Sequence, residues 1–281
     1  MKKHAVLFFI LLLIVFTSSC APDESEKVVD TNRYQDYAKN NGGIVRFFKD
    51  GKYGFIDESG EIIIEPRFDL AWDFSEDIAC VCLNDKYGFI DKGGNYICEP
   101  RFDYAEDFSE EMGLIKIEKF VDGNFKDQYG FIDRSGIIVI DPVYDFAQSF
   151  SEGLANVKSD GENGFIDKTG KFVIQPKYSF ALPFSERLAG VTFDNKEWGF
   201  IDKNGVVVIE PQFEAVYSFS EGMARIVQDG KFGFIDLTGE IVIEPIYDWA
   251  EDFNSDYARV SLGNYDIGYF NCIDKTGKFI W

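Results

Sequence analysis

The side chains of this sequence that could take part in chemistry recur at regular spacing. Five serines at intervals of 34 to 42 residues are each followed by a glutamate: Ser75, Ser109, Ser151, Ser185 and Ser220. Seven aspartates, one in each repeat unit, follow an isoleucine and precede a glycine by three residues: Asp57, Asp91, Asp133, Asp167, Asp202, Asp236 and Asp274. A catalytic site normally occurs once in a chain, and a serine nucleophile needs a neighbouring base. The repetition therefore favours turn-forming roles for both sets.

The only histidine is His4, near the N-terminus. Its position excludes a Ser-His or Cys-His catalytic pair in the rest of the chain. It also excludes a metal site that requires imidazole. With 49 acidic residues, carboxylate pairs are plentiful, but nothing in the sequence selects one. We therefore expect a protein that is not an enzyme, with no catalytic residue, no metal and no cofactor.

The repeated aspartates and the cysteines allow two further hypotheses. Calcium takes six to eight oxygen ligands, whereas each Asp-x-x-Gly turn offers one carboxylate, so turn capping is the simpler interpretation. Cys80 and Cys82 alternate along one predicted strand and align with polar residues, which suggests an outward face. Cys98 aligns with a core position. A disulfide from Cys98 to Cys80 or Cys82 and plain packing of thiols both stay open.

The N-terminus has the pattern of a secretory signal. Lys2 and Lys3 precede an apolar run over residues 5–16, and small residues lead to Cys20. This segment resembles the lipobox of bacterial lipoproteins, although Thr17 departs from its usual aliphatic residue. The resemblance implies cleavage before Cys20 and attachment of lipid to it. We expect a signal peptide over residues 1–19 and an acidic flexible tether over 20–43, with the chain anchored to the membrane and not spanning it.

The charge of the chain narrows the choice of partner. There are 28 basic and 49 acidic residues, a net charge of −21. Such a chain repels DNA, RNA and anionic headgroups, so no nucleic-acid partner is expected. The apolar fraction of 46% is typical of a folded domain.

An internal repeat defines the architecture of residues 44–281. An aromatic-Gly-Phe-Ile-Asp run recurs with its glycine at 54, 88, 130, 164, 199 and 233, and a proline follows each glycine by twelve residues. Short β-branched runs between glycines and prolines predict strands, and Asp-x-x-Gly predicts a tight hairpin turn. Each unit then holds three strands and a packed connector of the form Pro-x-aromatic-Asp-x-Ala-x-x-Phe-Ser-Glu.

These repeated residues resemble the WG (KWG) β-repeat family of bacterial proteins. Only Trp198 matches the tryptophan of the motif; Tyr53, Tyr87, Tyr129 and Phe232 replace it, and Asn163 breaks it. The resemblance implies an extracytoplasmic or interaction module without a known reaction. We expect an all-β tandem array of about seven three-stranded antiparallel units. The array would form either a propeller-like ring or an open twisted solenoid.

Departures from the repeat indicate where a partner could bind. The third unit carries about eight extra residues near 120–127, and the seventh about four near 265–271. Insertions in repeat proteins often lie on a binding face, so we name a candidate binding loop with Phe120, Asp122, Asn124 and Phe125. Neutral variation is the alternative. Trp72 and Trp249 lie in connectors and would be either exposed platforms or core residues.

The sequence favours a non-catalytic protein of the bacterial cell envelope, extracytoplasmic and held at the membrane by lipid on Cys20. Its partner would be another protein or an envelope polymer. The protein would be secreted if Cys20 carried no lipid. Two alternatives remain: a carboxylate-dependent hydrolase of envelope glycans, and a structural spacer.

Overall fold

The fold consists of β-strands joined by tight turns. A computed structural model describes residues 43–121, 123–263 and 270–280, and none of these residues is helical. None of the described segments is therefore an apolar helix of membrane-spanning length. The predicted signal peptide and the lipidated Cys20 lie outside the described residues, as does the predicted tether apart from Gly43.

The strands of the described residues form seven separate antiparallel sheets, which we call blades 1 to 7 in chain order. Blade 1 contains β1 (Ile44–Lys49), β2 (Lys52–Asp57) and β3 (Ile62–Phe68). Blade 2 contains β4 (Leu70–Ala71), β5 (Ile78–Leu83), β6 (Lys86–Asp91) and β7 (Tyr96–Phe102). Blade 3 contains β8 (Tyr104–Ser109), β9 (Met112–Val121), β10 (Asn124–Asp133) and β11 (Ile138–Tyr144). Blade 4 contains β12 (Phe146–Ala147), β13 (Ala155–Ser159), β14 (Glu162–Ile166) and β15 (Phe172–Tyr178).

The remaining three blades follow the same order. Blade 5 contains β16 (Phe180–Ala181), β17 (Ala189–Thr192), β18 (Trp198–Ile201) and β19 (Val207–Phe213). Blade 6 contains β20 (Ala215–Val216), β21 (Met223–Gln228), β22 (Lys231–Asp236) and β23 (Ile241–Tyr247). Blade 7 contains β24 (Trp249–Ala250), β25 (Tyr257–Ser261) and β26 (Asn271–Asp274).

Seven units are present, as the repeat predicted, and each is a simple antiparallel meander. The connector contributes more than packing. Its aromatic-Asp-x-Ala segment pairs with the next strand, so that Ala71 lies opposite Val81. Blades 2 to 6 therefore have four strands, the first of which is usually two residues long.

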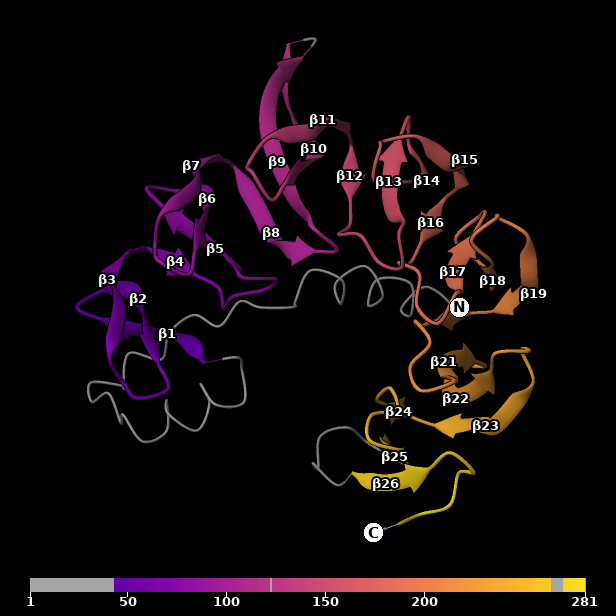
Figure 1. The fold of residues 1–281 in the computed structure, drawn as a ribbon. Helices are drawn as coiled ribbons and strands as arrows, with labels where there is room; N and C mark the ends of the chain where they lie inside the picture. The colour runs from indigo at the N-terminus through magenta and orange to yellow at the C-terminus, as the bar shows by residue number, and fades with distance from the viewer. Residues whose placement is uncertain (1–42, 122, 264–269, 281) are drawn as a thin grey trace.

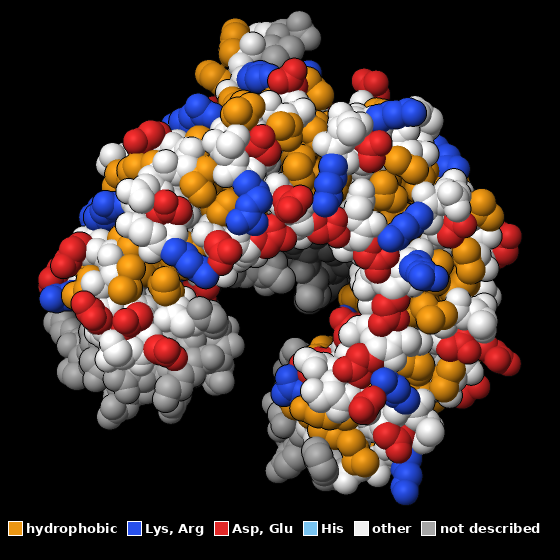
Figure 2. Space-filling model, viewed as in Figure 1, with side chains coloured by type: hydrophobic (Ala, Val, Ile, Leu, Met, Phe, Trp, Pro, Cys, Tyr) orange, Lys and Arg blue, Asp and Glu red, His pale blue; other side chains and the backbone are white. Residues whose placement is uncertain are grey.

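The blades are arranged in an open arc. Figure 1 shows the connector strands on the concave edge and strands such as β7, β15 and β19 on the convex edge. Blades 1 and 7 stand apart, and Figure 2 shows the space between them. The sequence left two arrangements open, a propeller-like ring and an open twisted solenoid. The described blades curve as in a propeller, but the curve does not close.

The hydrophobic core lies between neighbouring blades. Phe55 of β2 packs against Phe74 of the next connector, with ring centroids 4.9 Å apart, and Ile90 of blade 2 joins the same cluster. Equivalent phenylalanine pairs recur at 4.8–5.1 Å along the arc. A single sheet cannot bury these rings by itself, so each blade requires its neighbour.

The glycine and the proline of each repeat are coupled by close packing. A Cβ on Gly54 would lie 2.4 Å from the carbonyl oxygen of Ile64 and 2.7 Å from the nitrogen of Pro66. The pairing of β2 with β3 shifts at this point, because residues between Ile64 and Phe68 bulge towards Gly54. Only glycine allows this approach, which explains the common period of the two residues.

Candidate functional site

The largest departure from the repeat is the hairpin formed by β9 and β10. Each strand has ten residues, whereas the equivalent β5 and β6 have six. Figure 1 shows the hairpin extending away from the arc at blade 3. The inserted residues thus lengthen two paired strands: Phe120 lies opposite Phe125, and Lys119 opposite Lys126.

The end of this hairpin carries two exposed aromatic rings. Phe120 is 67% exposed and Phe125 is 68% exposed, the highest values among the large exposed hydrophobic residues described. Their ring centroids are 5.1 Å apart in an edge-to-face arrangement. Exposed apolar side chains in contact with each other, at the end of a projecting element, are typical of a surface that meets a partner.

Polar contacts hold the base of the hairpin. The Lys119 Nζ atom donates a 2.8 Å hydrogen bond to the carbonyl oxygen of Pro142 in β11. Lys116 Nζ lies 2.9 Å from Asp127 Oδ2 across the two strands. The hydrogen bond and ion pair raise the pKa of Lys116 against the lowering effect of its burial. The aromatic end is therefore presented on a braced support.

The structure brings together two of the four residues predicted for a binding loop, Phe120 and Phe125. Asn124 is exposed and begins β10 beside them. Asp122 lies outside the described residues. The sequence contained a signal for the paired strands, because Glu118-Lys119-Phe120 and Phe125-Lys126-Asp127 mirror each other around the turn. Most of the second insertion, near 265–271, also lies outside the described residues.

The repeated Ser-Glu pairs join blades to one another, a role that sequence reasoning missed. Each serine hydroxyl donates to the carbonyl oxygen of the phenylalanine in the next blade at 2.7–2.8 Å, in the pairs Ser75–Phe108, Ser109–Phe150, Ser151–Phe184, Ser185–Phe219 and Ser220–Phe253. The Glu76 carboxylate accepts from the amides of Glu110 and Glu111, both at 2.7 Å. The sequence did contain a signal for this role, because each Ser-Glu pair directly follows a core phenylalanine.

The Asp-x-x-Gly aspartates cap their own turns. Asp167 Oδ1 accepts hydrogen bonds from the Thr169 hydroxyl and from the amides of Thr169 and Lys171. The Thr169 hydroxyl, followed by the amides, lowers the pKa of Asp167. The described residues contain no group of three or more His, Cys, Asp or Glu arranged to hold a metal.

The four described cysteines are free and buried. Cys80 and Cys82 are 1% and 4% exposed, so the prediction of an outward face is wrong. Asn156, which aligns with Cys80, is itself buried, and its side-chain amide donates to the carbonyl of Ala181. This side of the strand faces the next blade, and burial raises the pKa of the Cys80 thiol well above its usual value.

Trp72 and Trp249 are half-buried, between the two alternatives that the sequence left open. The Trp72 ring lies 5.7 Å from that of Tyr87, and the Trp249 ring 4.9 Å from that of Phe270. Each tryptophan therefore packs against an aromatic neighbour and keeps part of its surface accessible.

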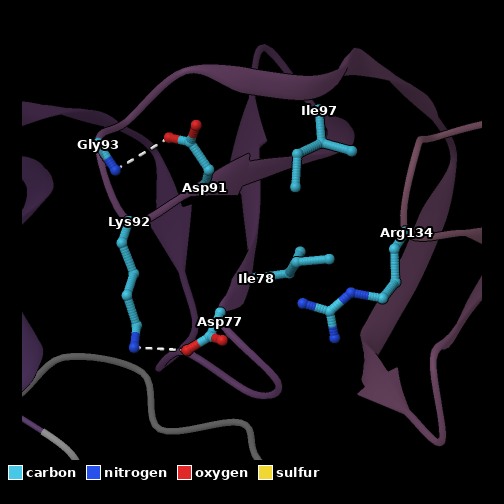
Figure 3. Close-up of a pocket in the computed structure, with 7 residues that line it drawn as sticks. All are labelled: Asp77, Ile78, Asp91, Lys92, Gly93, Ile97 and Arg134. Carbon is cyan, nitrogen blue, oxygen red and sulfur yellow. Dashed lines mark hydrogen bonds and ion pairs between the residues drawn. The ribbon is translucent and has the colours of Figure 1, made fainter.

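A shallow hollow of about 500 Å³ lies between blades 2 and 3. Figure 3 shows Lys92 paired with Asp77, and the amide of Gly93 donating to Asp91. Arg134 also lines it, and its Nη1 atom is 3.8 Å from Glu76 Oε2. Because these charged groups are paired within the protein, the hollow offers weaker recognition than the aromatic end of the hairpin.

The blade geometry explains why the motif repeats. The same motif is found in a known protein family. The family model described as "WG containing repeat" matches residues 53–87, 87–119, 129–162, 164–196, 198–232 and 232–265. The chain belongs to this family. The WG matches cover parts of all seven blades, and the position of the WG tryptophan is occupied in the described blades mainly by tyrosine or phenylalanine that packs at blade contacts. No curated protein matches the sequence.

Solved structures with a similar fold have little sequence in common with this WG-repeat chain. A crystal structure titled "eukaryotic initiation factor" aligns with a TM-score of 0.55 and 11% identity, covering 84% of this chain and 72% of that one. BamB from Moraxella catarrhalis aligns with a TM-score of 0.45 and 10% identity, covering 79% of each chain. At such identities the likeness concerns the fold only.

Proposed function

We propose that this WG-repeat protein is a non-catalytic binding protein of the bacterial cell envelope, anchored by lipid on Cys20, whose β9–β10 hairpin contacts a protein or envelope polymer. The observation that carries the proposal is the exposed Phe120–Phe125 pair on its braced hairpin. In contrast, the repeated Ser, Glu and Asp side chains are engaged in hydrogen bonds that hold the blades and turns.

The energetics fit a contact surface better than a structural element. Covering the two-thirds of each phenylalanine side chain that is exposed contributes about 1–2 kcal/mol per ring. A partner could bury these two rings on binding, whereas the fold of the chain leaves them exposed. Substituting both rings should therefore affect binding much more than stability.

The test is a cross-linked pull-down of the tagged full chain from its native envelope, with bound material identified by mass spectrometry. The double variant Phe120→Ala/Phe125→Ala should lose a stoichiometric partner while keeping the unfolding transition of the parent. Phe193→Ala is the matched control, because Phe193 is 47% exposed and packs on Tyr178 far from the hairpin. Equal recovery of partner with both variants would overturn the proposal.

A further inference from the structure

Two blade contacts contain an arginine that reaches from one blade into the next. In the contact between blades 6 and 7, Arg225 Nη1 donates to the carbonyl oxygen of Ala250 at 2.5 Å, and Arg225 Nε to Asp252 Oδ1 at 2.5 Å. In the contact between blades 1 and 2, Arg46 Nη1 donates to the carbonyl of Ala71 at 2.7 Å. In both contacts the residue whose carbonyl accepts the hydrogen bond follows the arginine by 25 residues. The aspartate that pairs with the arginine follows it by 27 residues.

An aromatic face completes the receptor for Arg225. The guanidinium carbon lies 3.8 Å from the ring centroid of Tyr217, and the amide of Tyr217 donates to the carbonyl of Arg225 at 3.0 Å. The Tyr217 ring is 6.1 Å from that of Phe232, with an interplanar angle of 35°. A planar cation thus meets a ring, a carboxylate and a carbonyl, a set of partners that suits a guanidinium.

The contact between blades 2 and 3 has the same frame with a different residue at the arginine position. Cys80 stands there, with Ala105 and Asp107 at the same 25- and 27-residue distances. The Cys80 Sγ atom lies 3.8 Å from the carbonyl oxygen of Ala105. The amide of Trp72 donates to the Cys80 carbonyl at 3.0 Å, so Trp72 occupies the place of the stacking tyrosine.

The aromatic geometry of the two contacts agrees closely. The Trp72 and Tyr87 rings are 5.7 Å apart with an interplanar angle of 37°, close to the values for Tyr217 and Phe232. The ring, the carbonyl and the carboxylate of a guanidinium receptor are therefore all present between blades 2 and 3. Cys80 supplies only a short, buried thiol where Arg46 and Arg225 supply a cation in their contacts.

Asp107 is the one aspartate at this position of the described blade contacts that has no arginine at the position before it in the frame. The three contacts whose arginine position holds Leu114, Asn156 or Gly190 have an uncharged residue in place of the aspartate, namely Ser149, Pro183 and Ser218. Asp107 keeps its carboxylate beside Cys80. Its Oδ1 atom is buried and accepts no hydrogen bond from any described residue.

We propose that Trp72, the Ala105 carbonyl and Asp107 form a binding site for a guanidinium group, supplied by an arginine side chain of a partner protein. The two internal arginines are the template for the bound group. Trp72 and Asp107 are both partly exposed, and they lie in the connector segments of the concave edge, where Figure 2 shows acidic side chains. This site is separate from the hairpin, so each proposal can fail without the other.

The first test measures binding of N-acetyl-arginine amide to the detergent-solubilised full chain labelled with 5-fluorotryptophan. The chain has four tryptophans, and the variant Trp72→Phe assigns the Trp72 resonance. We expect a saturable shift of that resonance at millimolar concentrations, typical of a small fragment. Asp107→Asn should weaken binding at least about tenfold, because it removes a charge-assisted hydrogen bond.

Two ligand controls separate the chemistry and its source. N-acetyl-citrulline amide keeps the shape without the charge and should give no shift. If free L-arginine bound more tightly than the amide, the guanidinium site would stand but a small molecule would replace the partner protein. An equal shift with citrulline, or a shift unchanged by Asp107→Asn, would overturn the site.

The second test supplies the guanidinium from the chain itself. Cys80→Arg should reproduce the arrangement of Arg225, raise the melting temperature by about 2–4 °C and abolish binding of the arginine probe. The matched control is Asn156→Arg, which has Ala181 at the carbonyl position but Pro183 where the carboxylate should be, and it should not raise the melting temperature. A folded Cys80→Arg protein that still bound the probe would contradict the proposal.

Discussion

The hydroxyl of Ser220 in blade 6 donates a 2.8 Å hydrogen bond to the carbonyl oxygen of Phe253 in blade 7, and the adjacent Glu221 carboxylate binds the amides of Ser255 and Asp256. One Ser-Glu pair thus holds both the core phenylalanine and the turn of the following blade. Because the pair recurs along the arc, neighbouring blades are joined by polar contacts as well as by packed rings. Stability should therefore depend on these contacts one blade junction at a time.

Ser220→Ala should lower the free energy of unfolding by about 1 kcal/mol, because the half-buried carbonyl of Phe253 loses its donor. Urea denaturation followed by circular dichroism measures the change. Ser218→Ala is the control: Ser218 lies in the same connector, and its side chain makes no hydrogen bond with a described residue. Equal destabilisation by both substitutions would show that the Ser220 contact contributes nothing of its own.

Leu237→Lys should stabilise the contact between blades 5 and 6. At the equivalent position of other blades Lys203 lies 2.9 Å from Glu152, and Lys275 lies 3.2 Å from Glu221, whereas the 42% exposed Leu237 leaves Glu186 without that cation. An exposed ion pair contributes about 0.2–1 kcal/mol. The gain should appear in urea denaturation at low salt and vanish at about 1 M salt, where charges are screened. Leu237→Gln should show no such salt-dependent gain.

Asp107→Asn should stabilise the protein at neutral pH. Burial, followed by repulsion from Asp73 and Glu106 against attraction by Arg46, raises the pKa of Asp107 from 3.8 to about 6. The folded state therefore holds a proton that the unfolded state releases, and stability falls as pH rises from about 4 to 6. This effect amounts to at most about 3 kcal/mol at pH 7.

Thermal or urea unfolding of wild type and Asp107→Asn across pH 4–7.5 measures this effect. The two proteins should have similar stability at the acid end, with the variant more stable by about 1–3 kcal/mol at pH 7. Asp252→Asn is the control, because its carboxylate is paired with Arg225 and its loss should destabilise the protein at neutral pH. A pH-independent difference for Asp107→Asn would rule out titration of this carboxyl as the cause.

Cys20→Ser should release the protein from the membrane. The proposed lipid is the only anchor under this hypothesis, and the variant would lack the thiol to which it attaches. Cell fractionation followed by immunoblotting should show the protein moving from the membrane pellet to the soluble extracytoplasmic fraction. Cys272→Ser, at a buried position in the folded part, should leave the distribution unchanged. Retention of Cys20→Ser in the membrane would contradict lipid anchoring through this residue.

The sequence by itself determined the all-β class, the number of units and the tight turns, whereas the fourth strand of blades 2 to 6 appeared only in the structure. These features depend on neighbouring residues: Asp167 caps a turn closed by Gly170, and Pro176 lies in the bulge of β15 that packs against Gly164. It also located the hairpin insertion and predicted that Phe120 and Phe125 belong together in a binding element. Local hydrogen bonding and steric limits on glycine and proline act over a few residues and are therefore visible in the sequence.

Only the tertiary structure decided how distant units meet. The open curve of the arc, the inward orientation of Cys80 and the role of the Ser-Glu pairs depend on contacts between residues some 25 to 35 positions apart. Asp107 shows the physical reason most directly. Its pKa is raised first by burial and then by repulsion from Asp73, a residue of another blade that approaches it only when the blades stack.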